Sequence, residues 1–387
     1  MNNLMETYKR LPVAFVRGEG AYLEDTEGKR YLDALTGLAV CGLGHAHPAV
    51  ARAIADQAAT LSHTSNLYQI PLQERLAERL CELSGMEKVF FGNSGAEANE
   101  AAIKIARLHG HNQGIDRPSI VAMEGSFHGR TMATLTATGN RKVQAGFEPL
   151  LSGFVRAPFG DVAAIALIGK NNPDVTAVLV EPVLGEGGII IPEDGYLEAL
   201  RRICDEHNWL LMLDEVQTGN GRTGTMFAYQ QTGILPDVVT TAKGLGNGMP
   251  IGACLARGQA AGILKPGNHG STFGGNLLAC AAAHAVLDTL TGEGLFERAN
   301  TLGKRIVDGL NSALTGNNRV QDVRGKGLMI AVELASPCGE LVEAALRSGL
   351  LLNVTRDSVV RLLPPLTLTD AEADELVEKV ARVINDS

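Results

Sequence analysis

The chain has 387 residues, of which 45% are hydrophobic and 20% charged, so it is long enough for two or three packed lobes and too apolar for intrinsic disorder. Its formal net charge of −9 disfavours a protein that binds nucleic acid non-specifically. No run approaches the roughly 18 apolar residues of a membrane span, and residues 1–10 lack the features of a secretory signal or a transit peptide. Six cysteines without a C-x-x-C pair indicate free thiols in a reducing compartment, so we expect a cytoplasmic protein.

Strand-like and helix-like segments alternate along most of the chain. One helix is expected after Gly95, where Glu100 and Lys104 have the i,i+4 spacing of an ion pair, and another over residues 196–207. Several strand patterns are apolar throughout, as in strands buried on both faces of a parallel sheet, which predicts an α/β domain. The expected strands are 21–24, 30–33, 88–91, 119–123, 177–180, 209–213, 238–242 and 252–256.

The C-terminal part of the chain has a different pattern. Strand-like runs over 328–334, 350–353 and 359–363 precede a last helix, which opens with a capping box from Thr369 to Glu372. We therefore predict a small α+β domain in addition to the α/β domain. The expected parts are an N-terminal segment 1–50 that packs with the small domain, a large cofactor-binding domain 51–290, and the small domain 291–387.

Asp214 and Lys243 each end an apolar strand pattern, and glycines surround the lysine. Ligands of parallel α/β sheets lie beyond the carboxyl ends of the strands, so these two charges are expected at one site. A lysine amine can form a Schiff base with pyridoxal phosphate (PLP), and a carboxylate can pair with the pyridinium nitrogen. The alternative is a solvated surface lysine and a helix-capping aspartate.

Two glycine-containing loops are candidates for binding the phosphate of such a cofactor. Residues 93–96 lie between a strand and a helix, where free N–H groups and the helix dipole attract anions. A simple N-cap by Ser94 explains the same pattern. The second candidate, residues 269–272, offers hydroxyl groups in a glycine-flanked loop.

Further candidates are an aromatic ring and charged side chains at unusual positions. Phe127 and Arg130 lie together in one short stretch and offer a stacking face and a carboxylate clamp. Arg361 is a lone charge in an apolar strand, where a charge is usually paired or functional. Glu181 and Glu186 follow another apolar strand.

Two motifs suggest other chemistry but fit it poorly. The run 219–224 matches G-x-G-x-x-G, but it does not directly follow the strand, and the helix after it could have only about eight residues, so a dinucleotide site is disfavoured. The pairs His45-x-His47 and His109-x-His111 lack a cysteine or carboxylate at ligand spacing. We expect structural histidines and no metal site.

These stretches together resemble the class III (ornithine-type) aminotransferases, a PLP-dependent family of fold type I, over essentially the whole chain. The run 213–224, with Lys243 following, is highly specific, and the stretches 63–66 and 93–100 look most like the members that act on acetylornithine in arginine biosynthesis. Two residues depart from the family pattern: Ala96 stands where many relatives have threonine, and Leu184 replaces a common glutamine. The implied fold has a large domain with a mostly parallel central sheet and a smaller α+β domain.

The resemblance also implies roles for the cofactor-binding residues. Lys243 bonds to PLP and moves the proton between substrate and cofactor, and Asp214 keeps the pyridine nitrogen protonated. Gln217 contacts the side of the ring that carries the 3-hydroxyl, and Phe127 stacks on the ring. Thr272 reaches the phosphate of the neighbouring subunit, so the active unit is a homodimer. The phosphate cup is Ser94, Gly95 and Ala96.

Substrate-binding roles follow from the same resemblance. Arg130 binds the carboxylate of acetylornithine, and Arg361 binds the α-carboxylate of glutamate, with Glu186 as its movable partner. Tyr8 and Leu38 match two tyrosines that hold the charged α-amino group of free ornithine in related enzymes. Leu38 cannot hydrogen-bond that group, so an N-acylated substrate is expected.

The expected reaction is N2-acetyl-L-ornithine plus 2-oxoglutarate giving N-acetyl-L-glutamate 5-semialdehyde plus L-glutamate. Alternatives within the family are ω-aminotransferases that act on ornithine, succinylornithine or 4-aminobutyrate. A PLP-dependent aminomutase, which needs no second keto acid, is an alternative of another class, and an NAD dehydrogenase is a remote one.

Overall fold

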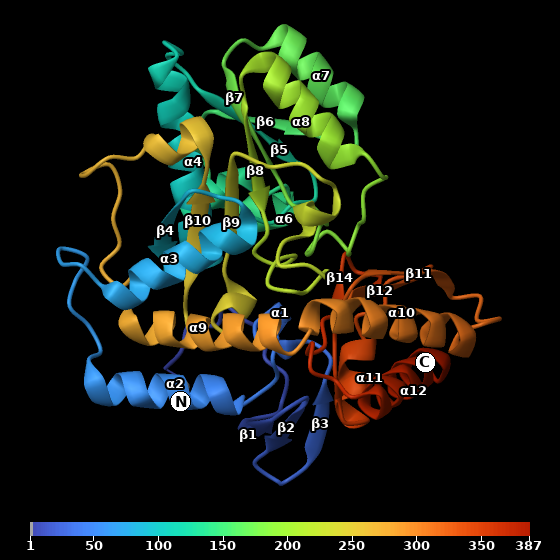
Figure 1. Ribbon diagram of the computed structural model, residues 1–387. Helices are drawn as coiled ribbons and strands as arrows, with labels where there is room; N and C mark the ends of the chain where they lie inside the picture. The colour runs from blue at the N-terminus through green and yellow to red at the C-terminus, as the bar shows by residue number, and fades with distance from the viewer. Residues whose placement is uncertain (1–2) are drawn as a thin grey trace.

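The computed structural model describes residues 3–387, so Met1 and Asn2, the first residues of the expected N-terminal segment, lie outside it. The chain forms a large body around a seven-stranded sheet and a smaller C-terminal lobe, with the N-terminal strands beside that lobe (Figure 1). No helix in the range 3–387 is long and apolar enough to cross a membrane.

Six of the seven strands in the central sheet run in one direction. The exception is β10, which is antiparallel to both of its neighbours, β4 and β9. The remaining neighbours pair in parallel, which confirms the predicted α/β domain with a mostly parallel sheet. The order across the sheet is β4 (Lys88–Gly92), β10 (Gly252–Ala256), β9 (Val238–Thr241), β8 (Leu210–Asp214), β7 (Val175–Val180), β5 (Ser119–Met123) and β6 (Phe154–Ala157).

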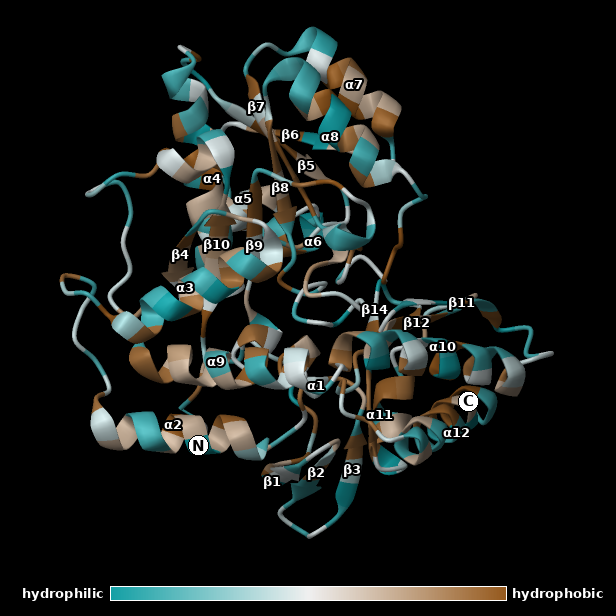
Figure 2. Cartoon of the chain, viewed as in Figure 1, coloured by the Kyte–Doolittle hydropathy of each residue, from teal (hydrophilic) through white to brown (hydrophobic). Residues whose placement is uncertain are grey.

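Helices cover both faces of this sheet, which is why its strands are apolar throughout (Figure 2). On one face α4 packs its alanines and isoleucines against β5, β7 and β8. On the other face lie α3, α7, α8 and α9. The helices of the large body are α2 (Pro48–Thr60), α3 (Pro71–Ser84), α4 (Gly95–Asn112), α5 (Met132–Ala137), α6 (Arg141–Gln144), α7 (Val162–Asn171), α8 (Tyr196–His207) and α9 (Leu277–Gly292), with 3-10 turns η1 (Ala228–Gln231), η2 (Lys243–Leu245) and η3 (Gly258–Gly262).

The C-terminal lobe is an antiparallel sheet with helices, as its sequence pattern predicts. Its core joins α10 and α12 to the sheet and also includes part of α9, so the two lobes pack closely. The predicted capping box at Thr369 is present at the start of α12. The elements are β11 (Val320–Lys326), β12 (Met329–Leu334), β15 (Val359–Leu362) and β14 (Asn353–Thr355) in sheet order, with α10 (Leu295–Ala313), α11 (Leu341–Arg347) and α12 (Asp370–Asn385).

The expected single strand over residues 350–353 is wrong, because this run divides between two sheets. Its first half, β13 (Leu350–Leu351), pairs in parallel with β3 of the N-terminal sheet, and its second half begins β14. The N-terminal segment is thereby tied to the C-terminal lobe. Its other elements are β1 (Phe15–Glu19), β2 (Tyr22–Asp25), β3 (Arg30–Asp33) and the short α1 (Thr36–Ala39).

Candidate active site

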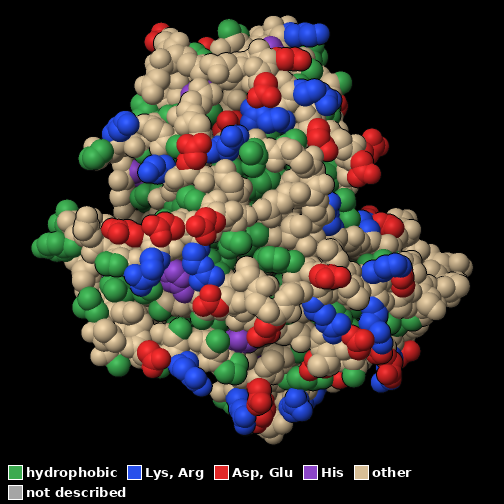
Figure 3. Space-filling model, viewed as in Figure 1, with side chains coloured by type: hydrophobic (Ala, Val, Ile, Leu, Met, Phe, Trp, Pro, Cys, Tyr) green, Lys and Arg blue, Asp and Glu red, His purple; other side chains and the backbone are tan. Residues whose placement is uncertain are grey.

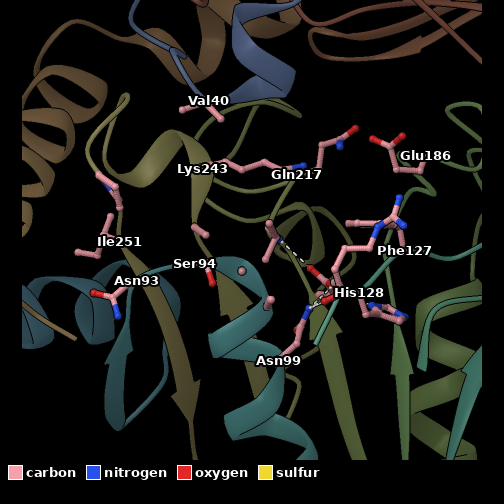
Figure 4. A pocket seen from close by; sticks show the side chains of 18 of the residues that line it. Val40, Asn93, Ser94, Asn99, Phe127, His128, Glu186, Gln217, Lys243 and Ile251 are labelled. Carbon is pink, nitrogen blue, oxygen red and sulfur yellow. Dashed lines mark hydrogen bonds and ion pairs between the residues drawn. The ribbon is translucent and has the colours of Figure 1, made fainter. Parts of the chain in front are cut away.

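A cavity of about 440 Å³ lies beyond the carboxyl ends of the parallel strands (Figure 4). The loops after β4, β5, β7, β8 and β9 each contribute to its wall, as expected for a ligand site in an α/β sheet. Most of the predicted site residues line it: Ser94, Gly95, Ala96, Phe127, Arg130, Glu186, Asp214, Gln217 and Lys243.

Asp214, the last residue of β8, is 3% exposed and accepts hydrogen bonds on both carboxylate oxygens. Oδ2 accepts from Asn99 Nδ2 at 2.7 Å and lies 2.8 Å from His128 Nδ1, which donates to it because a carboxylate only accepts. Oδ1 accepts from the backbone N–H of Val216 at 3.0 Å. These donors hold the buried carboxylate, which lines the cavity, in one orientation.

Asn99 and His128 were not among the residues predicted from the sequence. Asn99 lies on the apolar face of α4 and is itself fixed by Thr240, whose hydroxyl donates to its Oδ1 at 2.7 Å. His128 is buried between the two residues that were selected, Phe127 and Arg130. A polar residue among the alanines of a buried helix face was the available signal for Asn99.

Lys243 follows β9 and points across the cavity toward Gln217 (Figure 4). Burial lowers the pKa of its amine, while the nearby carboxylates of Glu186 and Asp214 act in the opposite direction. A lowered pKa raises the fraction of neutral amine, which is the nucleophilic form. The backbone of Lys243 has a φ of +45°, a conformation that non-glycine residues rarely adopt.

The start of α4 lies at one end of the cavity, where Ser94, Gly95 and Ala96 line it. Ser94 caps this 18-residue helix, its hydroxyl accepting from the N–H of Glu97 at 3.2 Å. Gly95 packs so closely that an added Cβ would lie 2.7 Å from Val216 Cγ1. The first N–H groups of a helix have no partner within it, so this end can bind a phosphate.

The cavity therefore fits PLP at several independent points. A buried carboxylate and an amine with a lowered pKa line it, and a helix N-terminus lies at one end. Gln217 Oε1 is buried without a hydrogen-bond partner among residues 3–387, as expected of a group that faces a ligand. Phe127 offers a ring face, with the Arg130 guanidinium 5.6 Å from its centroid.

Glu186, which lines the cavity, forms an ion pair with Arg361. Arg361, on β15, is completely buried and donates from Nη1 to Glu186 Oε1 at 2.6 Å and from Nε to Asn353 Oδ1 at 3.2 Å. Its Nη2 has no partner within residues 3–387. Burial raises the pKa of Glu186, but the combined effect of Arg361, Lys243 and Gln217 in the opposite direction is larger. The pKa of Glu186 therefore lies below its ordinary value.

Glu181 also lines the cavity, and its carboxylate accepts hydrogen bonds from two loops. One carboxylate oxygen accepts from the N–H of Phe127 at 2.8 Å, and the other accepts from the N–H of Gly185 at 2.9 Å. Burial, opposed by His128 and assisted by Asp214, raises the pKa of Glu181 to about 7. Glu181 therefore joins the loop after β5 to the loop after β7.

Four predicted site residues are not among those that line the cavity: Arg361, which is buried and paired with Glu186, and three exposed residues. Thr272 lies in an exposed loop. Tyr8 is 77% exposed, and Leu38, in α1, is 40% exposed. In this structure none of these three exposed side chains is among the residues that line the cavity.

The run 219–224 and the histidines His45 and His109 make contacts that stabilise the fold. The helical turn that follows the run 219–224 is the four-residue η1, not a long helix. The glycines of the run pack tightly, and a Cβ at Gly219 would lie 2.7 Å from the carbonyl oxygen of Glu215. His45 pairs with Asp33 at 2.8 Å, and His109 lies 3.2 Å from the carbonyl oxygen of Asn208. Residues 3–387 contain no group of three or more His, Cys, Asp or Glu side chains placed to hold a metal.

Comparisons with known proteins agree with this geometry. A family model described as aminotransferase class-III matches residues 4–384. An acetylornithine aminotransferase of Nitrosomonas europaea is 58% identical over 99% of this chain and 98% of its own length. A crystal structure of the ornithine aminotransferase from Toxoplasma gondii matches with a TM-score of 0.96 at 34% identity, covering 99% of this chain and 93% of that one, and a second structure of that enzyme has PLP at partial occupancy in its active site. The acetylornithine aminotransferase from Elizabethkingia anophelis matches with a TM-score of 0.89 at 34% identity, covering 99% of this chain and 96% of that one.

Proposed function

Because the chain belongs to the class-III aminotransferases, we propose that it is a PLP-dependent enzyme that transfers the terminal amino group of N2-acetyl-L-ornithine to 2-oxoglutarate. The products are N-acetyl-L-glutamate 5-semialdehyde and L-glutamate, and the role is in arginine biosynthesis. One observation carries the proposal: a lysine with a lowered pKa, a buried carboxylate and the glutamate that pairs with Arg361 line one cavity. The full-length relatives at up to 58% identity support the choice of substrate.

PLP, when bound, supplies an electron sink that makes the hydrogen on the amine-bearing carbon acidic. Lys243 is the residue we assign to hold the cofactor and to carry that proton, because its amine is buried and its pKa is lowered. Asp214, held by Asn99 and His128, presents a fixed negative charge to the pyridine nitrogen. Gln217 is assigned to the 3-hydroxyl side of the ring.

The phosphate is assigned to the start of α4, formed by Ser94, Gly95 and Ala96. Backbone N–H groups and the helix dipole attract the anion there, so the missing hydroxyl at Ala96 removes one donor without removing the site. Phe127 is assigned to the face of the ring.

The Glu186–Arg361 pair allows one site to accept two different substrates. Glutamate reacts at its α-amine and brings a carboxylate close to that carbon, whereas acetylornithine reacts at its far end. We assign Arg361 to the α-carboxylate of glutamate, and its unpaired Nη2 gives that carboxylate a donor. Glu186 covers Arg361 when acetylornithine, held by Arg130, is the donor.

We also propose a cytoplasmic homodimer with shared sites. Large apolar side chains are exposed on the loop between α2 and α3 and near Thr272: Leu67 is 88% exposed, Tyr68 69% and Phe273 60%. Hydrophobic side chains gather at the left edge of the face in Figure 3, over the loop between α2 and α3. Such clusters are typical of subunit contacts, and a second subunit would bring Thr272 to its neighbour's phosphate. The six free cysteines are consistent with a reducing compartment.

Within each subunit we propose three parts, namely residues 1–50 packing with the small domain, 51–290 and 291–387. The pairing of β3 with β13 supports the link between the first part and the last.

Half-reactions of the purified PLP-loaded enzyme test the proposal. Acetylornithine, ornithine, succinylornithine and 4-aminobutyrate are mixed singly with the enzyme, and the cofactor spectrum is followed without 2-oxoglutarate. Leu38 offers no partner to the ammonium of free ornithine, so acetylornithine should exceed ornithine at least ~10-fold in kcat/KM, which requires only ~1.4 kcal/mol. Equal rates for both amines would refute the substrate assignment, and net product formed without any keto acid would indicate an aminomutase.

A further inference from the structure

The glycine-rich run 219–224 lies beside the proposed catalytic lysine, although its context does not fit a dinucleotide-binding motif. Its second residue, Asn220, is 5% exposed and has a φ of +56°. The backbone N–H of Asn220 donates to the carbonyl oxygen of Met226 at 2.7 Å, which fixes the loop. The side chain of Asn220 points to the segment that carries Lys243.

Two hydrogen bonds connect Asn220 to that segment. Its Nδ2 donates to Thr241 Oγ1 at 2.9 Å and to the backbone carbonyl oxygen of Ala242 at 3.0 Å. The carbonyl oxygen can only accept, so the amide nitrogen must face it. The other atom of the amide, Oδ1, is buried without a partner among residues 3–387. The side chain is thus oriented so that Nδ2 makes this contact, while the amide oxygen Oδ1 is left without a hydrogen bond.

The contact acts on the peptide group that determines the strained conformation of Lys243. The carbonyl of Ala242 and the N–H of Lys243 belong to one planar peptide group, so holding the carbonyl restricts φ of Lys243. That φ is +45°, and a non-glycine residue stays in this region only when its surroundings hold it there. Gly244 allows the approach, since a Cβ there would lie 3.2 Å from Asn220 Cβ.

We propose that Asn220 is a positioning residue that holds the backbone of Lys243 in the left-handed conformation and thereby aims its amine into the cavity. This inference rests on the proposed function of Lys243. It gives the glycine-rich run a role: the loop brings the amide of Asn220 to the carbonyl group directly before Lys243, just beyond the end of β9.

The test compares Asn220→Asp, which keeps the size but cannot donate, and Asn220→Ala with Asn208→Asp. Asn208 is a control because it is also an asparagine with positive φ, at +55°, but it is exposed and caps α8. The first measurement needs no cofactor: hydrogen exchange of the apoenzyme over residues 241–246, where the N–H of Leu245 donates to the carbonyl oxygen of Ala242 at 2.9 Å. Exchange there should accelerate at least ~10-fold in both Asn220 variants and not in the control.

The second measurement uses the PLP-loaded enzyme. The Asn220 variants should shift the pH midpoint of the absorbance of the lysine-bound cofactor by at least ~0.5 unit, because the amine meets its charged neighbours at a different angle. They should also slow the glutamate half-reaction about 10-fold at saturation, with little change in KM. Folded Asn220 variants with the exchange, midpoint and rate of the wild type would overturn the inference.

Borohydride reduction of the wild-type enzyme separates the two proposals. Trapped cofactor on another lysine would refute the assignment of Lys243. Trapped cofactor on Lys243, together with unchanged Asn220 variants, would refute the positioning role alone.

Discussion

Replacing Glu186 with glutamine should change which substrate the enzyme prefers. The substitution keeps the size of the side chain and removes its charge. In the present structure the carboxylate lies 2.6 Å from Arg361 Nη1, and the Arg361 side chain is completely buried. The variant leaves the guanidinium with two uncharged neighbours, Asn353 and the new amide.

The magnitude follows from burial. Breaking a fully buried ion pair costs ~3–5 kcal/mol, mostly because the remaining charge is unpaired. The Glu186 side chain is 35% exposed, so solvent screens part of its interaction and we discount the figure to ~1.5–3 kcal/mol. Glutamate no longer has to displace a carboxylate from Arg361 and supplies one itself, whereas acetylornithine leaves the arginine unpaired. The ratio of kcat/KM for glutamate over acetylornithine should therefore rise ~10–100-fold.

Stopped-flow spectra of the two half-reactions measure this ratio directly. Glu193→Gln is the control, since Glu193 is exposed and lies seven residues further along the same loop. An unchanged ratio in Glu186→Gln, with an intact fold by circular dichroism, would show that Glu186 does not cover Arg361 during turnover. A parallel loss of both half-reactions would also contradict the switch.

Three other expectations concern cofactor binding, assembly and pH. Asp214→Ala removes the acceptor of three donors, two of them buried, so PLP affinity in an absorbance titration and most activity should be lost, and near-normal turnover would mean a structural role only. Mixed dimers of Lys243→Ala and Thr272→Ala chains should contain one intact site and exceed both parent homodimers in activity; verified heterodimers without recovery would argue against a shared site. Asp33, with Cys41 as a second partner, raises the pKa of His45 to about 9 from an ordinary value near 6.5, so this pair stabilises the fold fully below pH 6.5 and loses its effect as pH rises through 9. The free energy of unfolding in urea should be ~1–2 kcal/mol lower at pH 10 than at pH 6 because of this pair, after discounting for solvent. Asp33→Asn should lack this contribution.

Local sequence patterns predicted the elements whose structure depends on their own residues. The inner strands of the central sheet are buried on both faces, so a mostly apolar run marks them, and β5 and β10 have the predicted bounds. The edge strand β6 was missed because it has four residues, is only partly buried and contains Arg156. The division of 350–353 between two sheets could not be predicted, since a pattern does not identify the partner strand.

Side-chain partners were less predictable than elements. Glu100 and Lys104 have the spacing of an ion pair on α4, but the structure pairs them differently. The Glu100 carboxylate accepts from Thr131, and Lys104 donates to the carbonyl oxygen of Asn268 at 2.6 Å. An exposed pair on a helix contributes only ~0.2–0.5 kcal/mol, so a nearby loop that offers a better partner determines the outcome.

The predicted site residues also fall into two groups: those that this chain alone places on the cavity, and those that it leaves exposed. Asp214 ends β8 and Lys243 closely follows the neighbouring β9, so the sheet alone brings them together. Tyr8, Leu38 and Thr272 are exposed, and no element of this chain places them on the cavity. If a second subunit completes the substrate end of the site, the preference for acetylornithine over ornithine depends on assembly, whereas the cofactor's bond to Lys243 does not. Dilution that dissociates the dimer should then abolish the substrate preference while borohydride still traps PLP on Lys243.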